Sequence, residues 1–265
     1  ILNILKLIVM KRNIIKSVFL FSVAAATLFS CSKEELVIEP RQSIRAENAF
    51  TSKENINAAI TGVYARLKSL RYYGRDLLAV AEAMSENGFA TNKSGRLVAE
   101  AANNPGAHFA NWQICYYGIA EINLILDAIP KLNVIPAVTP AERSSWVGQL
   151  YFLRALMYHD LARCYAYEPG VGVPGQDRGG IPIVLTTPTT IEAAVNTLPA
   201  RASINDVYTR IYTDLDSAVA NLTNPGTFSP ALATRVAAQA LYARVALYRG
   251  DYARAVSMCD MVLAN

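Results

Sequence analysis

Apolar side chains recur at every third or fourth position through most of the chain, which is the spacing of an amphipathic helix. The first such pattern covers residues 51–70 and begins with Thr51 and Glu54, whose spacing predicts a capping box at the helix start. A shorter helix is predicted from residue 76 to about residue 85. Residues 87–107 contain glycine, proline, asparagine and serine at short intervals, so we expect a long loop there.

Two longer helices are predicted in the middle of the chain. An apolar stripe begins near Phe109 and ends at Pro130, because proline cannot continue a helix. The next helix has a clear start signal, since Thr139 and Glu142 have the spacing of a capping box and Pro140 occupies the first helical position. The sequence therefore predicts a defined first turn for this second helix.

This second helix is expected to end at the turn signal of residues 168–170. Residues 169–200 are rich in glycine, proline and threonine, so a loop is predicted, with the segment "IPIVL" as its only strand-like piece. Another helix is expected to begin at Ser203, because Asp206 follows three residues later and an apolar stripe comes after it.

The most regular pattern lies in residues 229–265, where two helices are joined at Arg249, Gly250 and Asp251. Gly250 can adopt the left-handed conformation that reverses the chain after a helix. This arrangement is typical of a tetratricopeptide helix pair, although no strict repeat of about 34 residues is visible. We therefore predict an all-α fold of tetratricopeptide-like antiparallel helix pairs with long irregular loops.

Composition and charge argue against nucleic-acid binding and show that the net positive charge lies at the N-terminus. The chain is 52% hydrophobic and 17% charged, which is a globular composition. Its formal net charge is +4, and residues 1–31 carry four basic and no acidic side chains, so the remainder is neutral. No block of lysine and arginine follows residue 16, so we expect no nucleic-acid binding.

The N-terminal charge belongs to a predicted signal peptide. Met10 is followed by basic residues and then by fourteen uncharged residues, which is shorter than the ~20 residues that a membrane-spanning helix needs. We assign residues 10–30 to a lipoprotein signal peptide and expect residues 1–9 not to be native.

The stretch "LFSC" at residues 28–31 resembles a bacterial lipobox, which would make Cys31 the lipidated N-terminus of the mature protein. Acyl chains on Cys31 would anchor the protein to a membrane. Residues 31–46 would then form a lipidated tether, and residues 47–265 a helical domain that is truncated at its C-terminus. The alternative is an ordinary signal peptide with an incidental cysteine.

Three widely spaced cysteines remain after Cys31, and they form neither a disulfide framework nor a metal-binding pair. Each lies in an apolar helical pattern, so we expect buried free thiols. These cysteines are Cys115, Cys164 and Cys259.

Four stretches of the chain together resemble one known protein family. They are "YFLRALMYHDLARCYAYEPG" followed by "GGIPIVL", and residues 49–67, 203–222 and 237–256. The first resembles the central signature of the SusD/RagB family of outer-membrane nutrient-binding lipoproteins, and the other three resemble further segments of that family in the same order. The resemblance implies the N-terminal half of a SusD-like α/α superhelix. It also implies a lipid-anchored protein at the cell surface that binds a glycan or a peptide and passes it to a SusC-like TonB-dependent transporter in the outer membrane.

The sequence contains no pattern that favours catalysis, so no enzyme activity, cofactor or metal is expected. The two histidines, His108 and His159, lack the spacing of a zinc-binding motif, and His159 is expected to be a packing residue within a helix. Glu82 and Glu86 are four residues apart and could provide two carboxylates for glycoside hydrolysis. Such pairs more often face water, so we keep the glycoside hydrolase only as an alternative.

Binding of a sugar needs flat aromatic rings together with amide, carboxylate and guanidinium groups that reach the hydroxyls. The segment between the first and third helices supplies such groups in or near loops. The candidate ligand-binding residues are Tyr72, Tyr73, Arg75, Glu86, Asn87 and Trp112. Half-buried packing is the alternative for the two tyrosines, and a core position is the alternative for Trp112. The alternative function is a structural tetratricopeptide-type adaptor of the cell envelope without small-molecule binding.

Overall fold

Every regular element in the part of the chain that the computed structural model describes is helical. The described residues are 11, 16, 49–85, 87–130, 138–173, 175–224 and 231–265. The helices are α2 (Lys53–Leu67), α3 (Asp76–Met84), α4 (Val98–Ala101), α5 (Trp112–Ala128), α6 (Pro140–Tyr165), α7 (Ile191–Asn196), α8 (Ile204–Asn221), α9 (Arg235–Arg249) and α10 (Tyr252–Leu263). The predicted all-α fold is confirmed.

The chain divides into two compact units, residues 1–45 and residues 46–265, and all of these helices belong to the second unit. Cys31 and the whole of the predicted tether lie outside the described residues, as does the predicted signal peptide apart from residues 11 and 16. Within the described part of the chain, no helix combines the length and the apolar character needed to cross a membrane.

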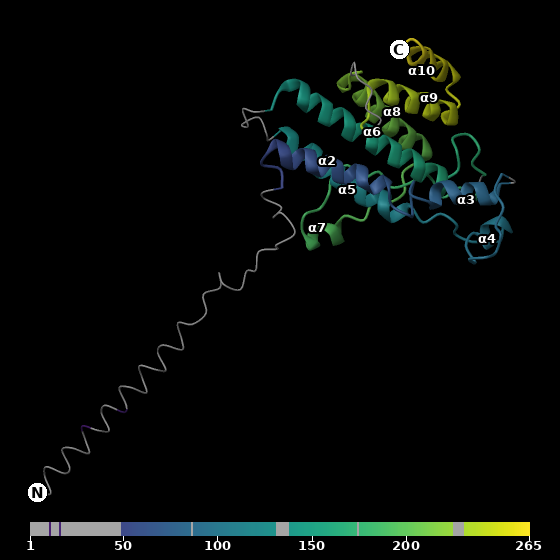
Figure 1. The fold of residues 1–265 in the computed structure, drawn as a ribbon, viewed down its shortest axis with the longest axis horizontal. Coiled ribbons are helices and arrows are strands. Elements are labelled where there is room, and N and C mark those ends of the chain that lie inside the picture. The colour runs from purple at the N-terminus through teal and green to yellow at the C-terminus, as the bar shows by residue number, and fades with distance from the viewer. Residues whose placement is uncertain are drawn as a thin grey trace, which may run out of the picture. The chain divides into compact units, whose positions relative to one another are not determined.

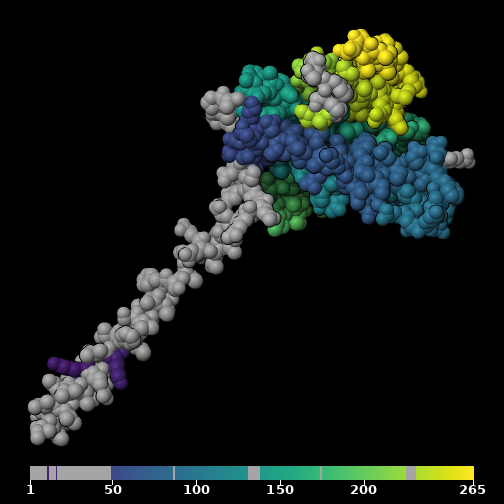
Figure 2. Space-filling view, in the orientation of Figure 1, coloured from purple at the N-terminus to yellow at the C-terminus, as the bar shows by residue number. Residues whose placement is uncertain are grey.

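The longer helices of the second unit pack as a series of neighbours. α2 packs against α5, α5 against α6, α6 against α8, α8 against α9, and α9 against α10 (Figure 1). In the space-filling view, the blue surface of α2 and α3 runs across this unit, and the yellow surface of α10 lies at its upper end (Figure 2). α6 is the central element, because it contacts α2, α5, α8 and α9 and buries residues along most of its length.

Local start and stop signals explain most helix boundaries. The capping box of α6 is confirmed, because the Thr139 hydroxyl accepts from the Glu142 backbone N–H and the Glu142 carboxylate accepts from the Thr139 backbone N–H. The turn between α9 and α10 is also confirmed, since Gly250 has a φ of 78°. The predicted cap of α2 is wrong, because Ser52 and not Thr51 is the N-cap and accepts from the backbone N–H of Asn55 at 3.2 Å.

The two predicted loops contain short helices that the sequence pattern did not indicate. α4 lies within residues 87–107, and α7 lies within residues 169–200. The helix that was expected to reach residue 168 ends at Tyr165. These elements are too short to produce a recognisable apolar period, so the pattern alone could not separate them from loop.

The strand-like segment of residues 181–185 forms no strand in the described structure and is part of the predicted loop. Side chains of α5 and α6 bind its backbone instead. The Tyr158 hydroxyl and Nδ2 of Asn123 donate to the carbonyl of Val184 at 2.7 and 2.9 Å, and the Tyr116 hydroxyl donates to a carbonyl in the same segment at 2.7 Å. Because these side chains satisfy its backbone groups, the segment needs no partner strand.

A buried polar network joins the central helices. The guanidinium group of Arg154 on α6 donates two hydrogen bonds, at 2.8 and 2.7 Å, to the carboxylate of Asp214 on α8. A third hydrogen bond goes from Arg154 to Oδ1 of Asn123 on α5 at 2.8 Å. Arg210 donates to the same Asp214 carboxylate at 2.5 Å. These three residues, Arg154, Asn123 and Asp214, are buried, so the network fixes the positions of α5, α6 and α8 relative to one another.

Candidate ligand-binding site

The C-terminal part of α6 carries a buried aspartate that fixes the loop between α2 and α3. Oδ2 of Asp160 accepts hydrogen bonds from the hydroxyls of Tyr72 at 2.6 Å and Tyr73 at 2.8 Å. Oδ1 of Asp160 accepts from Arg163 at 2.6 Å. Burial and the nearby Asp160 charge raise the pKa of Tyr73 above its ordinary value. The two tyrosines therefore act as neutral hydrogen-bond donors that attach this loop to α6.

On one side of the last turn of α6 lies a cavity of about 400 Å³, which we call the α3-side cavity. It combines apolar walls with two arginines and one carboxylate. Its lining residues are Tyr73, Leu77, Leu78, Ala81, Glu82, Phe109, Arg163, Cys164 and Arg244. Of the predicted ligand-binding residues that the structure describes, only Tyr73 is among them.

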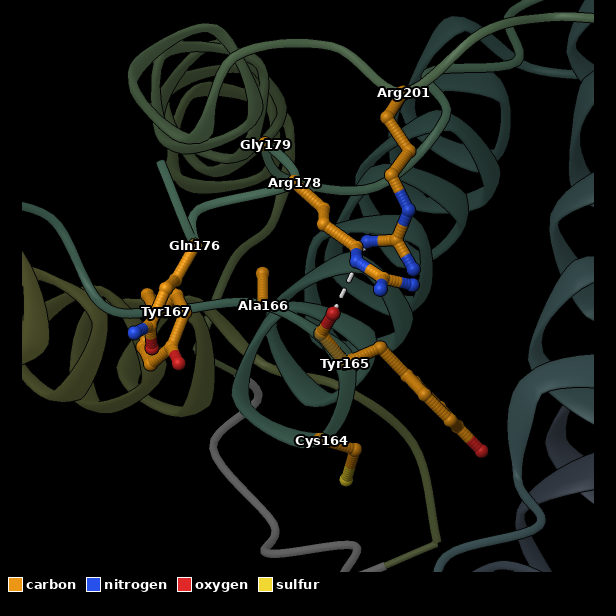
Figure 3. A pocket seen from close by; sticks show the side chains of 8 residues that line it. All are labelled: Cys164, Tyr165, Ala166, Tyr167, Gln176, Arg178, Gly179 and Arg201. Carbon is orange, nitrogen blue, oxygen red and sulfur yellow. Dashed lines mark hydrogen bonds between the residues drawn. The ribbon is translucent and has the colours of Figure 1, made fainter. Parts of the chain in front are cut away.

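On the other side of the same turn lies a cavity of about 350 Å³, the loop-side cavity. Its lining residues are Cys164, Tyr165, Ala166, Tyr167, Gln176, Arg178, Gly179 and Arg201 (Figure 3). Cys164 lines both cavities, so they are neighbours at the end of α6. In Figure 3, the side chains of Arg178 and Arg201 reach toward one another, while Tyr167 and Gln176 lie on the other side of Ala166.

Long-range hydrogen bonds hold the wall of the loop-side cavity. Nη1 of Arg201 donates to the carbonyl of Tyr165 at 3.0 Å and to the carbonyl of Gly180 at 2.5 Å. The backbone N–H of Gly180 donates to the carbonyl of Ala202 at 2.7 Å. Gly179 has a φ of 82°, and an added Cβ would lie 3.1 Å from the Ala202 carbonyl oxygen, so this close approach favours glycine.

Trp112 supports the loop-side cavity from the first turn of α5. Its ring packs edge-on against the ring of Tyr165 at 5.1 Å, and the Arg201 guanidinium lies 5.8 Å from its ring centroid. The Tyr165 hydroxyl accepts from the backbone N–H of Trp112 and donates to the carbonyl of Phe109. Trp112 is half-buried, so it positions two residues of the cavity wall.

The remaining predicted site residues are not brought together with this cavity pair. Tyr72 is fully buried behind Tyr73 and presents no accessible ring face. Arg75 lines a separate cavity of about 170 Å³, where it donates to Asp76 at 2.6 Å. Asn87 is exposed beyond the end of α3, and Glu86 lies outside the described residues. The predicted set remains a prediction: the structure brings Tyr72 and Tyr73 together at Asp160 of α6 and places Trp112 beside the loop-side cavity.

Four side chains of the loop-side cavity were missed by the sequence analysis. They are Tyr167, Gln176, Arg178 and Arg201. The available signal was an aromatic residue, Tyr167, at the predicted end of the long helix, followed by Gln176 and Arg178 in the predicted loop. Arg201 comes from the next segment of the chain and gave no local signal at all.

Burial shifts the pKa values of the thiol and the imidazole near the end of α6. Burial raises the pKa of Cys164 to about 11, and burial together with Arg163 lowers the pKa of His159 to about 3. His159 is fully buried, as expected for a packing residue. Within the residues that the structure describes, no group of three histidine, cysteine, aspartate or glutamate side chains is arranged to hold a metal.

The three free cysteines differ in exposure. Cys115 is buried and Cys164 is partly buried, but Cys259 is exposed, so the prediction of a buried thiol is wrong for Cys259. The reason is its position on α10, a helix in which only Met258 is buried. The suggested Glu82 and Glu86 pair stays untested, because Glu86 is not described.

Comparison with known proteins gives a consistent match over most of the chain. A SusD-like family model described as "Starch-binding associating with outer membrane" matches residues 37–247. The SusD-like protein P2 of Formosa agariphila is 29% identical over 262 residues, which cover 92% of this chain and 45% of that protein. The chain thus spans about half the length of this curated relative.

Solved structures match the helical fold. A SusD superfamily protein from Bacteroides fragilis has a TM-score of 0.67 and 23% identity, with 81% of this chain and 50% of that protein covered. A SusD-like carbohydrate binding protein from Bacteroides vulgatus has a TM-score of 0.63 and 23% identity, with 81% and 45% covered. At this level of identity, the structural matches show a common fold.

Proposed function

Because the chain belongs to the SusD-like family, we propose that it binds a glycan at the cell surface and passes it to a SusC-like TonB-dependent transporter in the outer membrane. A peptide is the second class of nutrient that such a protein could take. The function is capture and delivery, without chemical change of the nutrient.

The loop-side cavity is the observation that supports glycan binding. A sugar ring presents an apolar C–H face and several hydroxyls, and it is recognised by an aromatic ring together with planar polar groups. Tyr167 is 43% exposed and lines the cavity together with the amide of Gln176 and the guanidinium groups of Arg178 and Arg201. This is the combination of groups that a sugar requires, and it lies on a loop supported by the rigid end of α6.

Affinity gel electrophoresis of the purified chain in gels that contain different polysaccharides tests this proposal. We expect at least one polysaccharide to retard the chain, and we expect Tyr167→Ala to weaken the retardation severalfold. Tyr252→Ala is the matched control, because Tyr252 is an exposed tyrosine on α10, 68% accessible, outside the cavity. Equal retardation of both variants would remove Tyr167 from the site, and the absence of retardation by every polysaccharide would contradict glycan binding.

Anchoring through Cys31 is a separate part of the proposal. It is supported by the lipobox-like sequence at residues 28–31 and by the outer-membrane association of the matched family. Cells that express the chain should incorporate labelled palmitate, and Cys31→Ala should abolish the incorporation. Cys259→Ala is the matched control, since it removes an exposed thiol from the helical unit. Equal labelling of the Cys31→Ala variant would contradict the anchor.

A structural adaptor of the cell envelope is the second candidate function. The outer face of α10 favours it, because Tyr252, Val256 and Leu263 are all exposed there and could pack against another protein. An adaptor would copurify with a protein partner and would show no affinity for any polysaccharide. The affinity gels therefore separate the two candidates.

A further inference from the structure

We propose that the loop-side cavity takes an anionic saccharide, whose carboxylate or sulfate ester lies between Arg178 and Arg201. This inference rests on the proposed glycan-binding function and adds the chemical class of the glycan. Both arginines line the same cavity, and Figure 3 shows their side chains converging there.

Neither arginine forms an ion pair within the described part of the chain. The hydrogen bonds that Arg201 donates go to two backbone carbonyls, which hold the guanidinium in place but carry no net charge. The nearest acidic residue in sequence, Asp177, is engaged within its own loop, since Oδ1 accepts from the backbone N–H of Gly179 at 2.8 Å. Two positive charges therefore converge on one cavity without a compensating carboxylate.

Several other arginines of the described chain form ion pairs. Arg154 pairs with Asp214, and Arg163 pairs with Asp160. Arg66 pairs with Glu121 as well. Arg178 and Arg201 differ from these three, because they line one cavity together and its described lining includes no carboxylate.

A guanidinium group binds carboxylate and sulfate oxygens through charge-assisted hydrogen bonds, which are stronger than its bonds to neutral hydroxyls. The two like charges repel each other, and a bound anion removes this repulsion, whereas a neutral sugar leaves it in place. Arg201 is positioned before binding by its carbonyl contacts, which lowers the entropy cost of binding. The site therefore favours an anionic ligand over a neutral one.

The other side of the cavity favours a saccharide over an acidic peptide. Tyr167 offers a ring face for the C–H surface of a sugar, and the Gln176 amide can both donate to and accept from hydroxyl groups. A peptide with acidic side chains would also bind the two arginines, but it would gain less from Tyr167 and Gln176.

The test compares wild-type chain with Arg178→Gln in binding to sodium polygalacturonate, carrageenan and laminarin, which carry carboxylates, sulfate esters and no charge respectively. Arg178 is chosen because Arg201 also supports the loop, so its replacement would disturb the fold. Arg178→Lys keeps the charge, and Arg254→Gln on the exposed side of α10 removes an equal charge elsewhere. Thermal melting of each variant checks that the helical unit is intact.

We expect polygalacturonate, carrageenan or both to bind more tightly than laminarin. Arg178→Gln should weaken this binding about tenfold, which corresponds to the loss of one charge-assisted contact. Arg178→Lys should recover part of the affinity, Arg254→Gln should have no effect, and added salt should weaken binding. Binding of polygalacturonate alone would identify a carboxylate, and binding of carrageenan alone would identify a sulfate ester.

Three results would overturn the inference. Equal binding of laminarin and the charged polysaccharides, unchanged in Arg178→Gln, would overturn the anionic class and leave glycan binding intact. Poly-L-glutamate is tested as an acidic peptide. Its binding, without binding of any polysaccharide, would show that the ligand is not a saccharide. Binding of none of these polymers, while the affinity gels show retardation by another neutral polysaccharide, would overturn the anionic class and leave the proposed function intact.

Discussion

The hydroxyl oxygen of Tyr72 lies 2.6 Å from Oδ2 of Asp160, and both side chains are fully buried. The contact joins the loop after α2 to the last third of α6, across 88 positions of sequence. Tyr73 and Arg163 also donate hydrogen bonds to the same carboxylate. Since Tyr73 and Arg163 also line the α3-side cavity, one buried aspartate organises a wall of the candidate site.

Replacement of Asp160 by alanine should therefore be severely destabilising. It leaves two tyrosine hydroxyls and the guanidinium of Arg163 without their acceptor, and the expected loss in free energy of unfolding is about 3–5 kcal/mol. Tyr72→Phe removes one donor and should cost only about 1 kcal/mol. Urea denaturation measures both values. Similar losses for the two variants would show that the carboxylate does not organise this cluster.

The Arg154 and Asp214 pair should behave as a coupled unit. Arg154→Met leaves the buried Asp214 carboxylate with the single remaining contact from Arg210, so we expect a loss of about 3 kcal/mol. The double variant Arg154→Met with Asp214→Leu removes the unpaired charge and should lose clearly less than the sum of the single variants. A double-mutant cycle by urea denaturation measures the difference. Additivity within about 0.5 kcal/mol would contradict the coupling.

Stability should fall in acid because of His159. Burial and the charges of Arg163 and Arg244 lower its pKa in the folded state from 6.5 to about 3. Between these values the unfolded chain binds a proton that the folded chain does not, so stability falls as the pH drops from about 6.5 towards 3, by at most about 1.4 kcal/mol per pH unit.

His159→Phe provides the comparison for this prediction. A phenylalanine keeps an aromatic ring beside Tyr248, whose ring centroid lies 5.1 Å from that of His159, but it cannot bind a proton. The difference in free energy of unfolding between wild type and variant should change with pH only below about 6.5. Parallel pH profiles for the two proteins would show that His159 contributes no pH dependence.

Helix boundaries set by neighbouring residues could be predicted from the sequence. Thr139 and Glu142 satisfy the backbone at the start of α6 within one turn, and Gly250 reverses the chain by its own backbone conformation. The error at Thr51 has the same local origin, because Thr51 and Ser52 are adjacent candidates for one N-cap and the sequence offers no measure of backbone angle.

The candidate site could not be predicted in the same way. Tyr72 and Asp160 are far apart in sequence, so the burial of Tyr72 depends on how α6 packs. The loop-side cavity depends on the hydrogen bonds of Arg201 to the Tyr165 and Gly180 carbonyls, which join segments 36 and 21 residues apart. The hydrophobic periodicity of the sequence carries no information about such long-range contacts. The sequence alone therefore showed only that this region contains aromatic and polar residues.

Hydrogen–deuterium exchange with and without a bound oligosaccharide tests the central claim most directly. The probes are laminarin and galacturonate oligosaccharides at saturating concentration. The account predicts slower exchange in peptides that span residues 164–181 and residue 201, with no change in α9 and α10. Protection confined to α9 and α10, or no protection with either probe, would contradict the claim that the cavity beside the end of α6 binds the glycan.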